Sequence, residues 1–339
     1  MIIVMGALAS KSEIRSVLAK IKEFGYTPHT IHGKTRKVIG AIGDERGKFV
    51  LQSLESLPGV ERVVPILKPY KLASREVKPE RTVIRIAPGV TVGDRQLLII
   101  AGPCSVESEQ QMTDTARAVK AAGAHMLRGG AFKPRTSPYA FQGLAKKGLK
   151  ILRAAGDKAG MPVVTEVMNP VDVELISEYS DVLQVGARNI QNFALLKRIG
   201  KSKRPILLKR GMMTTITEFL MSAEYLMSEG SRQVILCERG IRTFEDSTRN
   251  TLDLSAIPVL RERTHLPVIV DPSHGTGHAA YVPPMSCAAV AAGADGLMIE
   301  VHPKPEKALS DGPQSLTFEK FRETMKMISG FVAAAGRTL

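Results

Sequence analysis

Four side chains able to bind a metal ion follow predicted β-strands that are far apart in the sequence. They are Cys104, His274, Glu300 and Asp311. A thiolate, an imidazole and two carboxylates suit a divalent transition ion such as Mn, Fe, Co or Zn, and suit calcium poorly. Each residue alone also has an ordinary structural explanation, because a lone cysteine is usually a small buried hydrophobe. The metal site is therefore predicted only if the fold brings the four strand ends together.

Two further histidines compete for the imidazole role. His302 would share a face with Glu300 if the strand continued for two more residues, and His278 lies four residues beyond His274. We rank His274 first because it lies in the turn that follows the apolar run 268–270. Cys237 and Cys287 lie within apolar segments and are interpreted as packing residues.

A second group of residues could bind anions. Single basic residues follow several apolar runs, often beside glycine; they are Arg128, Lys133, Arg135, Arg188, Lys209, Arg210 and Arg239. Arg presents a planar fork to carboxylate or phosphate oxygens, and Lys acts on the same groups as a point charge. A solvated rim of separate salt bridges would have the same composition, but the neighbouring glycines favour close approach of the backbone to a ligand. This pattern predicts a site for at least two anionic groups.

The elements that would carry these residues alternate regularly. Short apolar runs recur at 97–101, 125–127, 162–165, 182–185, 206–208, 234–236, 268–270 and 297–299. Helical stretches lie between them, for example at 110–122, 144–159, 193–199, 217–228 and 279–292. This order predicts a (β/α)8 TIM barrel, in which the strand ends share one rim and the eighth strand lies between the seventh and the first. An open doubly wound sheet is the alternative, but its Gly-x-Gly-x-x-Gly turn is missing.

Residues 1–70 predict a separate small α+β domain. Segments 2–5, 11–24, 28–32, 37–42, 48–56 and 60–67 read strand, helix, strand, strand, helix, strand, which is the ferredoxin-like pattern. Such a half-exposed sheet suits an effector-binding module and an oligomerisation module equally. Prolines among charged residues predict a linker with a small hairpin over residues 71–95. Residues 96–339 remain for the barrel.

Composition narrows the classes of partner. The 339 residues carry a formal net charge of +14, which favours anionic partners. Aromatic residues make up only 5% and there is no Trp, so we expect small anions rather than nucleic acid. Three cysteines do not form a disulfide framework, and the apolar residues 1–9 are too short to span a bilayer. We therefore expect a cytoplasmic protein without a membrane partner.

At these residues the chain resembles the type I-beta group of 3-deoxy-D-arabino-heptulosonate 7-phosphate (DAHP) synthases, which begin the shikimate pathway of aromatic amino acid biosynthesis. The matching segments are Ala-Gly-Pro-Cys-Ser (101–105), Arg-Gly-Gly-Ala-Phe-Lys-Pro-Arg-Thr-Ser-Pro (128–138), Gly-Ala-Arg-Asn (186–189), Leu-Lys-Arg-Gly (208–211), Cys-Glu-Arg-Gly (237–240) and Asp-Pro-Ser-His (271–274). They span the barrel in the family's order, which is more specific than any single short motif.

The resemblance implies a metal-dependent, aldol-type condensation of phosphoenolpyruvate with erythrose 4-phosphate and water, with release of phosphate. By similarity, the metal ligands are Cys104, His274, Glu300 and Asp311. The residues expected to bind phosphoenolpyruvate are Arg128, Lys133, Arg188, Lys209 and Arg239, and those expected to seat the aldose phosphate are Lys133, Pro134, Arg135 and Thr136. Asp271 would contact the aldose or support the metal ligands, and Glu166 would position the attacking water. The catalytic set would be Cys104, Lys133, Glu166 and His274.

In some members of this group the ferredoxin-like domain binds tyrosine or phenylalanine as a feedback inhibitor, so the resemblance implies such an effector and a homotetramer. The nearest alternative is 3-deoxy-D-manno-octulosonate 8-phosphate synthase, which takes arabinose 5-phosphate; the Lys-Pro-Arg-Thr turn at 133–136 favours the shorter aldose. A non-catalytic, basic nucleic-acid-binding barrel is an alternative of another class. An amino-acid sensor with a degenerate barrel would require lost ligands, and all four are present.

Overall fold

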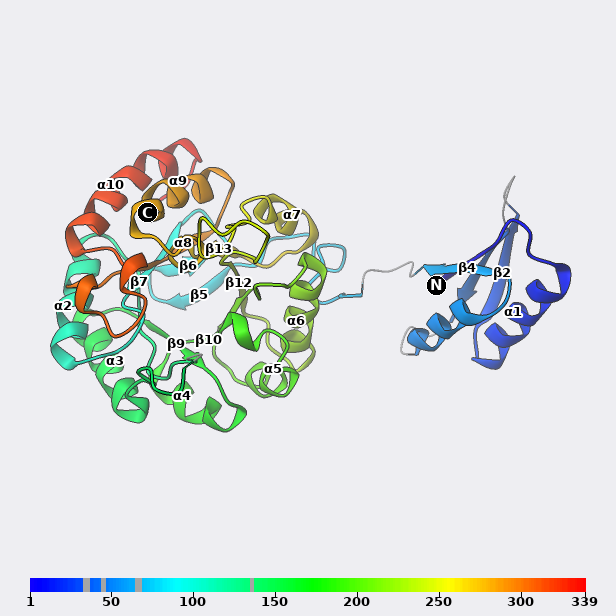
Figure 1. Cartoon of the computed structure of the whole chain (residues 1–339), viewed down its shortest axis with the longest axis horizontal. Helices are drawn as coiled ribbons and strands as arrows, with labels where there is room; N and C mark the ends of the chain where they lie inside the picture. Colours follow the sequence, from blue (N-terminus) through cyan, green and yellow to red (C-terminus); the bar gives the residue numbers. More distant parts are fainter. Residues whose placement is uncertain (33–36, 44–46, 65–68, 135–136) are drawn as a thin grey trace. The chain divides into compact units, whose positions relative to one another are not determined.

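The computed structural model describes residues 1–32, 37–43, 47–64, 69–134 and 137–339. The chain divides into two compact units, Met1–Pro69 and Tyr70–Leu339 (Figure 1). Each unit has its own hydrophobic core, so we describe each by itself.

The first unit is the predicted ferredoxin-like domain. Its elements are β1 (Ile2–Met5), α1 (Lys11–Glu23), β2 (Thr27–His32), β3 (Lys37–Ile42), η1 (Lys48–Ser56) and β4 (Val60–Val64). The strands form an antiparallel sheet in the order β2-β3-β1-β4. The second predicted helix is a 3-10 helix, η1, rather than an α-helix. The end of the predicted strand 60–67 falls partly outside the described residues.

Helix α1 packs on one face of this sheet. Ser10 caps its start, because the Ser10 side chain accepts from the Glu13 backbone N–H and the Glu13 carboxylate accepts from the Ser10 backbone N–H. The helix buries the apolar stripe that includes Val17 and Ile21 against Ile3 and Ile39 of the sheet. Each such buried branched side chain contributes about 1.5–3 kcal/mol relative to an exposed one.

The second unit is a closed parallel barrel. Within the described ranges its strands are β7 (Leu98–Gly102), β8 (Met126–Arg128), β9 (Val163–Val167), β10 (Val182–Val185), β11 (Ile206–Lys209), β12 (Val234–Glu238), β13 (Val268–Val270) and β14 (Gly296–Glu300). They close in the order β10-β11-β12-β13-β14-β7-β8-β9. The eighth barrel strand, β14, therefore pairs with both the seventh, β13, and the first, β7, as predicted.

Helices surround the barrel (Figure 1). The main ones are α2 (Glu109–Ala121), α3 (Ala145–Ala159), α4 (Val173–Tyr179), α5 (Phe193–Gly200), α6 (Ile216–Ser228), α7 (Ala256–Arg263), α9 (Val282–Ala291) and α10 (Phe318–Ala334). A short helix, α8 (Pro272–Thr276), and the 3-10 turns η2 (Pro170–Asp172), η3 (Ala187–Asn189), η4 (Ala279–Tyr281), η5 (Pro305–Lys307) and η6 (Gly312–Gln314) lie in the loops. The predicted helix 279–292 is η4 followed by α9.

The barrel interior is filled with apolar side chains and is covered at one end. Ile100, Met126, Leu207 and Ile269 belong to one buried cluster inside the barrel. The hairpin of β5 (Ile84–Ala87) and β6 (Val90–Val92) adds side chains to the same cluster, so this hairpin covers the end where the strands begin. The opposite rim, where the strands end, is left for a site.

Several barrel strands extend beyond the predicted apolar runs and include polar residues. Strand β9 includes Glu166, β11 ends at Lys209, β12 at Glu238 and β14 at Glu300. The predicted apolar runs end before each of these residues. Because these residues belong to the hydrogen-bonded sheet, their backbone positions are fixed by the neighbouring strands.

No helix in the portion of the chain that the structure describes is long and apolar enough to cross a membrane.

Candidate active site

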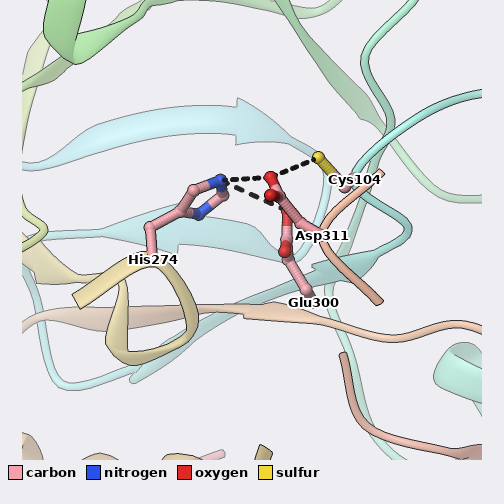
Figure 2. A group of neighbouring side chains, drawn as sticks. All are labelled: Cys104, His274, Glu300 and Asp311. Atoms are coloured by element: carbon pink, nitrogen blue, oxygen red, sulfur yellow. Dashed lines mark hydrogen bonds and ion pairs between the residues drawn. The ribbon is translucent and has the colours of Figure 1, made fainter. Parts of the chain in front are cut away.

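The four predicted metal ligands meet at the rim of the barrel (Figure 2). One ligand atom from each of Cys104, His274, Glu300 and Asp311 lies within 4.8 Å of the others. The Cys104 thiol donates to Asp311 Oδ2 over 3.1 Å, and His274 Nε2 lies 3.4 Å from Glu300 Oε1. Cys104 and Glu300 are buried, whereas His274 and Asp311 also reach a cavity.

Cys104 follows β7 at the point where the backbone of this strand lies close to that of its parallel neighbour β8. Gly102, the last residue of β7, has a φ of +151°, and a Cβ atom there would lie 2.2 Å from the Arg128 carbonyl oxygen. Only glycine fits this approach without displacing the backbone. Two residues further on, the Cys104 thiol accepts from Lys133 Nζ over 2.8 Å. The Lys133 ammonium also donates to the Cys104 carbonyl oxygen.

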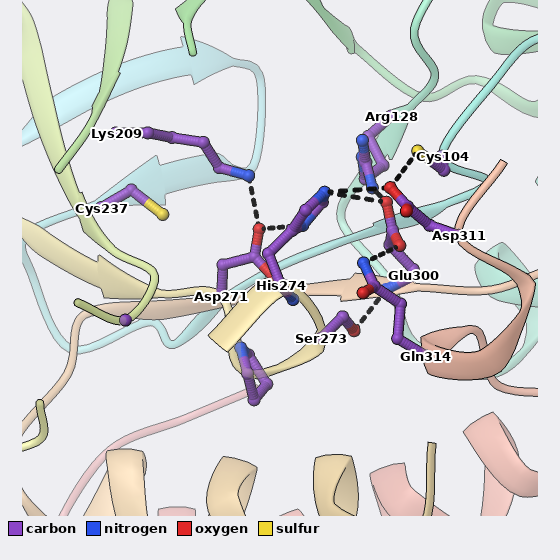
Figure 3. A network of polar contacts seen from close by, with 12 residues as sticks. Cys104, Arg128, Lys209, Cys237, Asp271, Ser273, His274, Glu300, Asp311 and Gln314 are labelled. Atoms are coloured by element: carbon purple, nitrogen blue, oxygen red, sulfur yellow. Dashed lines mark hydrogen bonds and ion pairs between the residues drawn. The ribbon is translucent and has the colours of Figure 1, made fainter. Parts of the chain in front are cut away.

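His274 lies on the short helix α8, directly after β13. Asp271 caps this helix by accepting from the His274 backbone N–H over 2.9 Å, and Pro272 occupies its first turn. Asp271 Oδ2 also lies 2.7 Å from His274 Nδ1 and forms an ion pair with Lys209 (Figure 3). The Asp271 contact directs His274 Nε2 toward Glu300 and Asp311.

Glu300 and Asp311 are held by separate partners. Glu300 Oε1 pairs with Arg128, and Glu300 Oε2 accepts from Gln314 Nε2 over 2.6 Å (Figure 3). Asp311 has a φ of +51°, in the left-handed region that is uncommon for residues other than glycine. Its Oδ1 lies 3.3 Å from Nη1 of Arg249, which also donates to the Gln314 side-chain oxygen over 2.8 Å. Arg249 therefore contacts both Asp311 and the residue that holds Glu300.

The electrostatics of this cluster fit a divalent cation. Burial, together with the charges of Glu300 and Asp311, raises the pKa of the Cys104 thiol to about 12 against the opposing effect of Lys133. Burial lowers the pKa of His274, which keeps its imidazole neutral. A cation among these atoms would reverse the effect of the two carboxylates on the thiol and favour the thiolate, which is the form that binds metals.

A cavity of about 320 Å³ lies beside the metal-ligand cluster. The basic residues that line it are Arg128, Lys133, Arg188, Lys209, Arg239 and Arg249. His274 and Asp311 line it as well, so two of the four metal ligands face the same space. Its volume is at the small end of the range for ligand pockets, which suits small anionic molecules.

The cations of the cavity differ in how far they are neutralised. Arg128 pairs with Glu300 and Lys209 with Asp271. Arg239 is buried, and its Nη1 atom has no hydrogen-bond partner among the described residues. Burial lowers the pKa of Arg239, although Asp271 partly opposes this effect. A buried guanidinium with an unsatisfied N–H is the group that gains most from a bound anion.

Arg210 does not face this cavity, contrary to the prediction. Its guanidinium is buried and pairs with Glu238 and Asp253, each over 2.8 Å, and its Nε donates to the Thr214 carbonyl oxygen. Lys209 and Arg210 are adjacent in a strand and its extension, where side chains point to opposite faces. Because Lys209 points into the cavity, Arg210 points away from it.

Glu166 lines the cavity beside its cations. Its Oε2 accepts from Gln184 Nε2 over 3.2 Å, whereas its buried Oε1 has no hydrogen-bond partner within the described ranges. Gly186 makes room for this carboxylate, since a Cβ atom there would lie 2.0 Å from Glu166 Oε1. The unpaired oxygen is a potential acceptor for a water molecule or a substrate hydroxyl.

The expected aldose-binding segment is described only in part. Lys133 is buried and Pro134 lines the cavity, but Arg135 and Thr136 lie outside the described residues. Asp271 is fully buried between His274 and Lys209 and does not belong to the cavity lining.

The competing residues have other partners. His278 packs against the ring of Tyr281, with ring centroids 5.4 Å apart. His302 is buried, and its Nε2 lies 3.3 Å from Glu107. Cys237 and Cys287 are buried in apolar clusters. The four-ligand group therefore contains His274 alone of the three candidate histidines.

Sequence reasoning missed three residues of the site: Gln184, Arg249 and Gln314. A glutamine inside the apolar run 182–185 was a usable signal, because a polar residue in a buried strand needs a partner. Arg249 lies in the long irregular segment between β12 and α7, and Gln314 lies in η6. Neither has a periodicity or spacing that separates it from ordinary loop residues.

The fold and this geometry define a (β/α)8-barrel enzyme with a candidate metal centre beside an anion-binding cavity. Residues 77–332 match the DAHP synthetase I family, and residues 1–68 match the DAHP synthase ferredoxin-like domain. The chain belongs to the DAHP synthetase I family, whose members are generally metal-dependent.

Individual relatives agree with this assignment. The chain is 52% identical over 336 residues to phospho-2-dehydro-3-deoxyheptonate aldolase of Thermotoga maritima, with 99% of each sequence covered. A crystal structure of this aldolase (DAHP synthase) from T. maritima matches with a TM-score of 0.94 at 50% identity, covering 99% of this chain and 98% of that one. A 2-dehydro-3-deoxyphosphooctonate aldolase of Nitrosococcus oceani is 33% identical and covers 73% of this chain and 95% of its own. The more distant, partial likeness does not favour the octulosonate alternative.

Proposed function

We propose that the protein condenses phosphoenolpyruvate with erythrose 4-phosphate and water to give DAHP and phosphate. The observation that carries this proposal is that His274 and Asp311 belong both to the four-ligand group and to the lining of a cavity rich in Arg and Lys. Such a cavity can hold a phosphorylated carboxylate and a phosphorylated aldehyde against a metal ion. The near full-length likeness to the T. maritima aldolase supports the same assignment.

Cys104, His274, Glu300 and Asp311 would hold the divalent ion, with Mn, Fe, Co and Zn as candidates. A bound ion would supply Lewis-acid polarisation of the aldehyde oxygen. Asp271 would keep His274 Nδ1 protonated and its ring oriented, and Gln314 would hold Glu300. We assign Asp271 this positioning role in place of a direct aldose contact, because it is fully buried.

Arg128, Lys133, Arg188, Lys209 and Arg239 would bind the carboxylate and phosphate of phosphoenolpyruvate. Lys133 would also face the aldose, whose phosphate would be seated by Pro134, Arg135 and Thr136. With both substrates oriented, C3 of phosphoenolpyruvate can attack the aldehyde carbon. Glu166 would position the water that adds at C2, where positive charge develops, and phosphate then leaves.

We further propose that residues 1–70 form an effector-binding domain for tyrosine or phenylalanine. Residues 71–95 would link this domain to the catalytic barrel of residues 96–339. The enzyme would be a cytoplasmic homotetramer. The match of residues 1–68 to the DAHP synthase ferredoxin-like domain supports an effector site. If millimolar Tyr and Phe leave the rate unchanged and removal of residues 1–69 does the same, the domain has only a structural role.

The decisive experiment measures phosphate release from phosphoenolpyruvate with erythrose 4-phosphate and, in parallel, with arabinose 5-phosphate. We expect phosphate release with the four-carbon aldose, no release after chelation, and recovery of activity when divalent ions are added. A preference for the five-carbon aldose would assign the octulosonate reaction, and full activity in a strong chelator would contradict the metal role. Steep salt-dependent nucleic-acid binding without any phosphate release would favour the non-catalytic alternative.

A further inference from the structure

A second hollow lies at the opposite end of the barrel, where the strands begin. Its volume is about 710 Å³, and five of its lining residues are arginines: Arg75, Arg81, Arg95, Arg261 and Arg337. They come from the segment before the β5–β6 hairpin, the turn between β6 and β7, helix α7 and the C-terminal segment after α10. The fold therefore gathers cations that are up to 262 positions apart in the sequence, between Arg75 and Arg337.

The carboxylates of this hollow do not neutralise the arginines. Asp295 is fully buried and pairs with both Arg81 and Arg337. Arg75, Arg95 and Arg261 form no ion pair with any carboxylate of the described residues. Asp94 and Glu262 line the hollow, and Asp295 is buried behind two of its arginines, so three carboxylates stand against five arginines and the net charge is +2.

The arginines are close enough to repel one another. Burial lowers the pKa of Arg261, and the charges of Arg81, Arg337 and Arg75 lower it further, against the attraction of Asp295. The Nε atoms of Arg75 and Arg337 have no hydrogen-bond partner among the described residues. The guanidinium groups thus have both charge and N–H donors in excess of what the surrounding residues supply.

Helix ends explain only part of this cluster. Arg261 Nη1 donates to the Gly293 carbonyl oxygen just beyond α9, a favourable position for a cation at a helix C-terminus. No comparable contact is made by the side chains of Arg75 and Arg95 within the described residues. A carbonyl oxygen also carries only a partial charge, so it does not offset the net +2.

We propose that this hollow, which we call the five-arginine site, binds a compact oxyanion with two negative charges, such as the phosphate group of a small metabolite. Planar guanidinium forks bind phosphate oxygens in pairs, and two charges match the excess in the hollow. The lining contains no aromatic side chain on which a base could stack, which disfavours single-stranded nucleic acid. Anion binding in this hollow does not depend on the reaction at the other end of the barrel.

Equilibrium binding of inorganic phosphate to the full-length protein tests this proposal. At pH 8 phosphate is a dianion, and ionic strength is held constant with chloride. We expect at least two phosphates per chain in titration calorimetry, one in the five-arginine site and the rest at the catalytic rim. The double variant Arg95→Gln/Arg261→Gln should bind the phosphate of the five-arginine site at least about tenfold more weakly, while Arg188→Gln should weaken binding only at the catalytic rim.

Arg232→Gln is the matched control, because Arg232 is exposed and precedes β12 at the same end of the barrel. It should leave both affinities unchanged. Crystals soaked with tungstate should show anomalous density among Arg75, Arg95 and Arg261. Unchanged phosphate binding in a correctly folded double variant, or no anomalous density among these three arginines, would overturn the proposal.

Discussion

Asp271 Oδ2 lies 2.7 Å from His274 Nδ1, and this contact defines which nitrogen of the imidazole is available to a metal. With the proton held at Nδ1, the Nε2 lone pair faces Glu300 and Asp311. Because burial lowers the pKa of His274, the imidazole is already neutral before an ion binds.

Metal binding should therefore release one proton per chain near neutral pH, and that proton comes from Cys104. Burial raises the pKa of this thiol to about 12, so the metal-free protein carries it protonated. Metal affinity should rise about tenfold for each pH unit between about pH 7 and 9. Calorimetry in buffers of different ionisation enthalpy counts the protons; zero protons would mean that Cys104 does not bind the ion as a thiolate.

Replacing Cys104 with Ala should abolish turnover by removing a metal ligand. We expect more than about a 100-fold loss of rate together with a low metal content, since even indirect changes around a metal cost 10- to 100-fold. Cys287→Ala is the control, because Cys287 is buried in the outer core away from the ligand group. Full metal content with normal activity in Cys104→Ala would exclude this residue from the ligand set.

Arg249→Ala should weaken metal binding by about 10- to 100-fold, because Arg249 holds Asp311 and Gln314, and Gln314 holds Glu300. Equilibrium dialysis followed by metal analysis measures the change without relying on turnover. Arg242→Ala alters an exposed residue of the same segment and should have no effect. Equal affinities in the two variants would show that the Arg249 contacts are incidental.

Glu166→Gln should lower kcat by about 100-fold or more while changing the KM for phosphoenolpyruvate little, because the lost carboxylate acts on water rather than on binding. Steady-state phosphate release separates the two constants. Glu178→Gln changes an exposed carboxylate on α4 and should be neutral. A Glu166→Gln enzyme within twofold of the native kcat would assign the water to another group.

The metal-free protein should lose stability in acid. Burial raises the pKa of Glu300 and of Asp271, but His274 and the cations Arg128 and Lys209 outweigh it, so both pKa values fall below their usual range. A lowered carboxyl pKa stabilises the folded state above the ordinary pKa near 4, and this contribution is lost as pH falls through the folded-state value. Urea unfolding between pH 7 and 3 should show the decline, and a flat profile would contradict it.

The (β/α)8 barrel and the convergence of the four metal ligands could be predicted because both depend on the order of the strands along the chain. Apolar runs such as 182–185 and 268–270 have the length and residue types of buried strands, and their bounds match β10 and β13. Barrel closure then requires β14 to lie beside β7, which brings Glu300 near Cys104. The proximity of Glu300 and Cys104 therefore follows from strand order alone, without any side-chain contact.

Side-chain direction could not be predicted in the same way. Lys209 and Arg210 have similar charges and adjacent positions, yet Lys209 lines the cavity and pairs with Asp271, whereas Arg210 pairs with Glu238 and does not line the cavity. The difference depends on where β11 ends relative to the rim. Arg249 was missed for a related reason, since its contact with Asp311 joins two irregular segments whose paths follow no sequence period.

The candidate metal centre lies across the seam where the barrel closes. Cys104 follows the first barrel strand and Glu300 ends the last, and these two strands pair directly along their whole length. An ion bound between them would join the two ends of the barrel sequence as a clamp. Removing the ion should therefore accelerate amide hydrogen exchange most strongly in β7 and β14. The barrel would open first between these two strands, where the beginning and the end of its sequence meet.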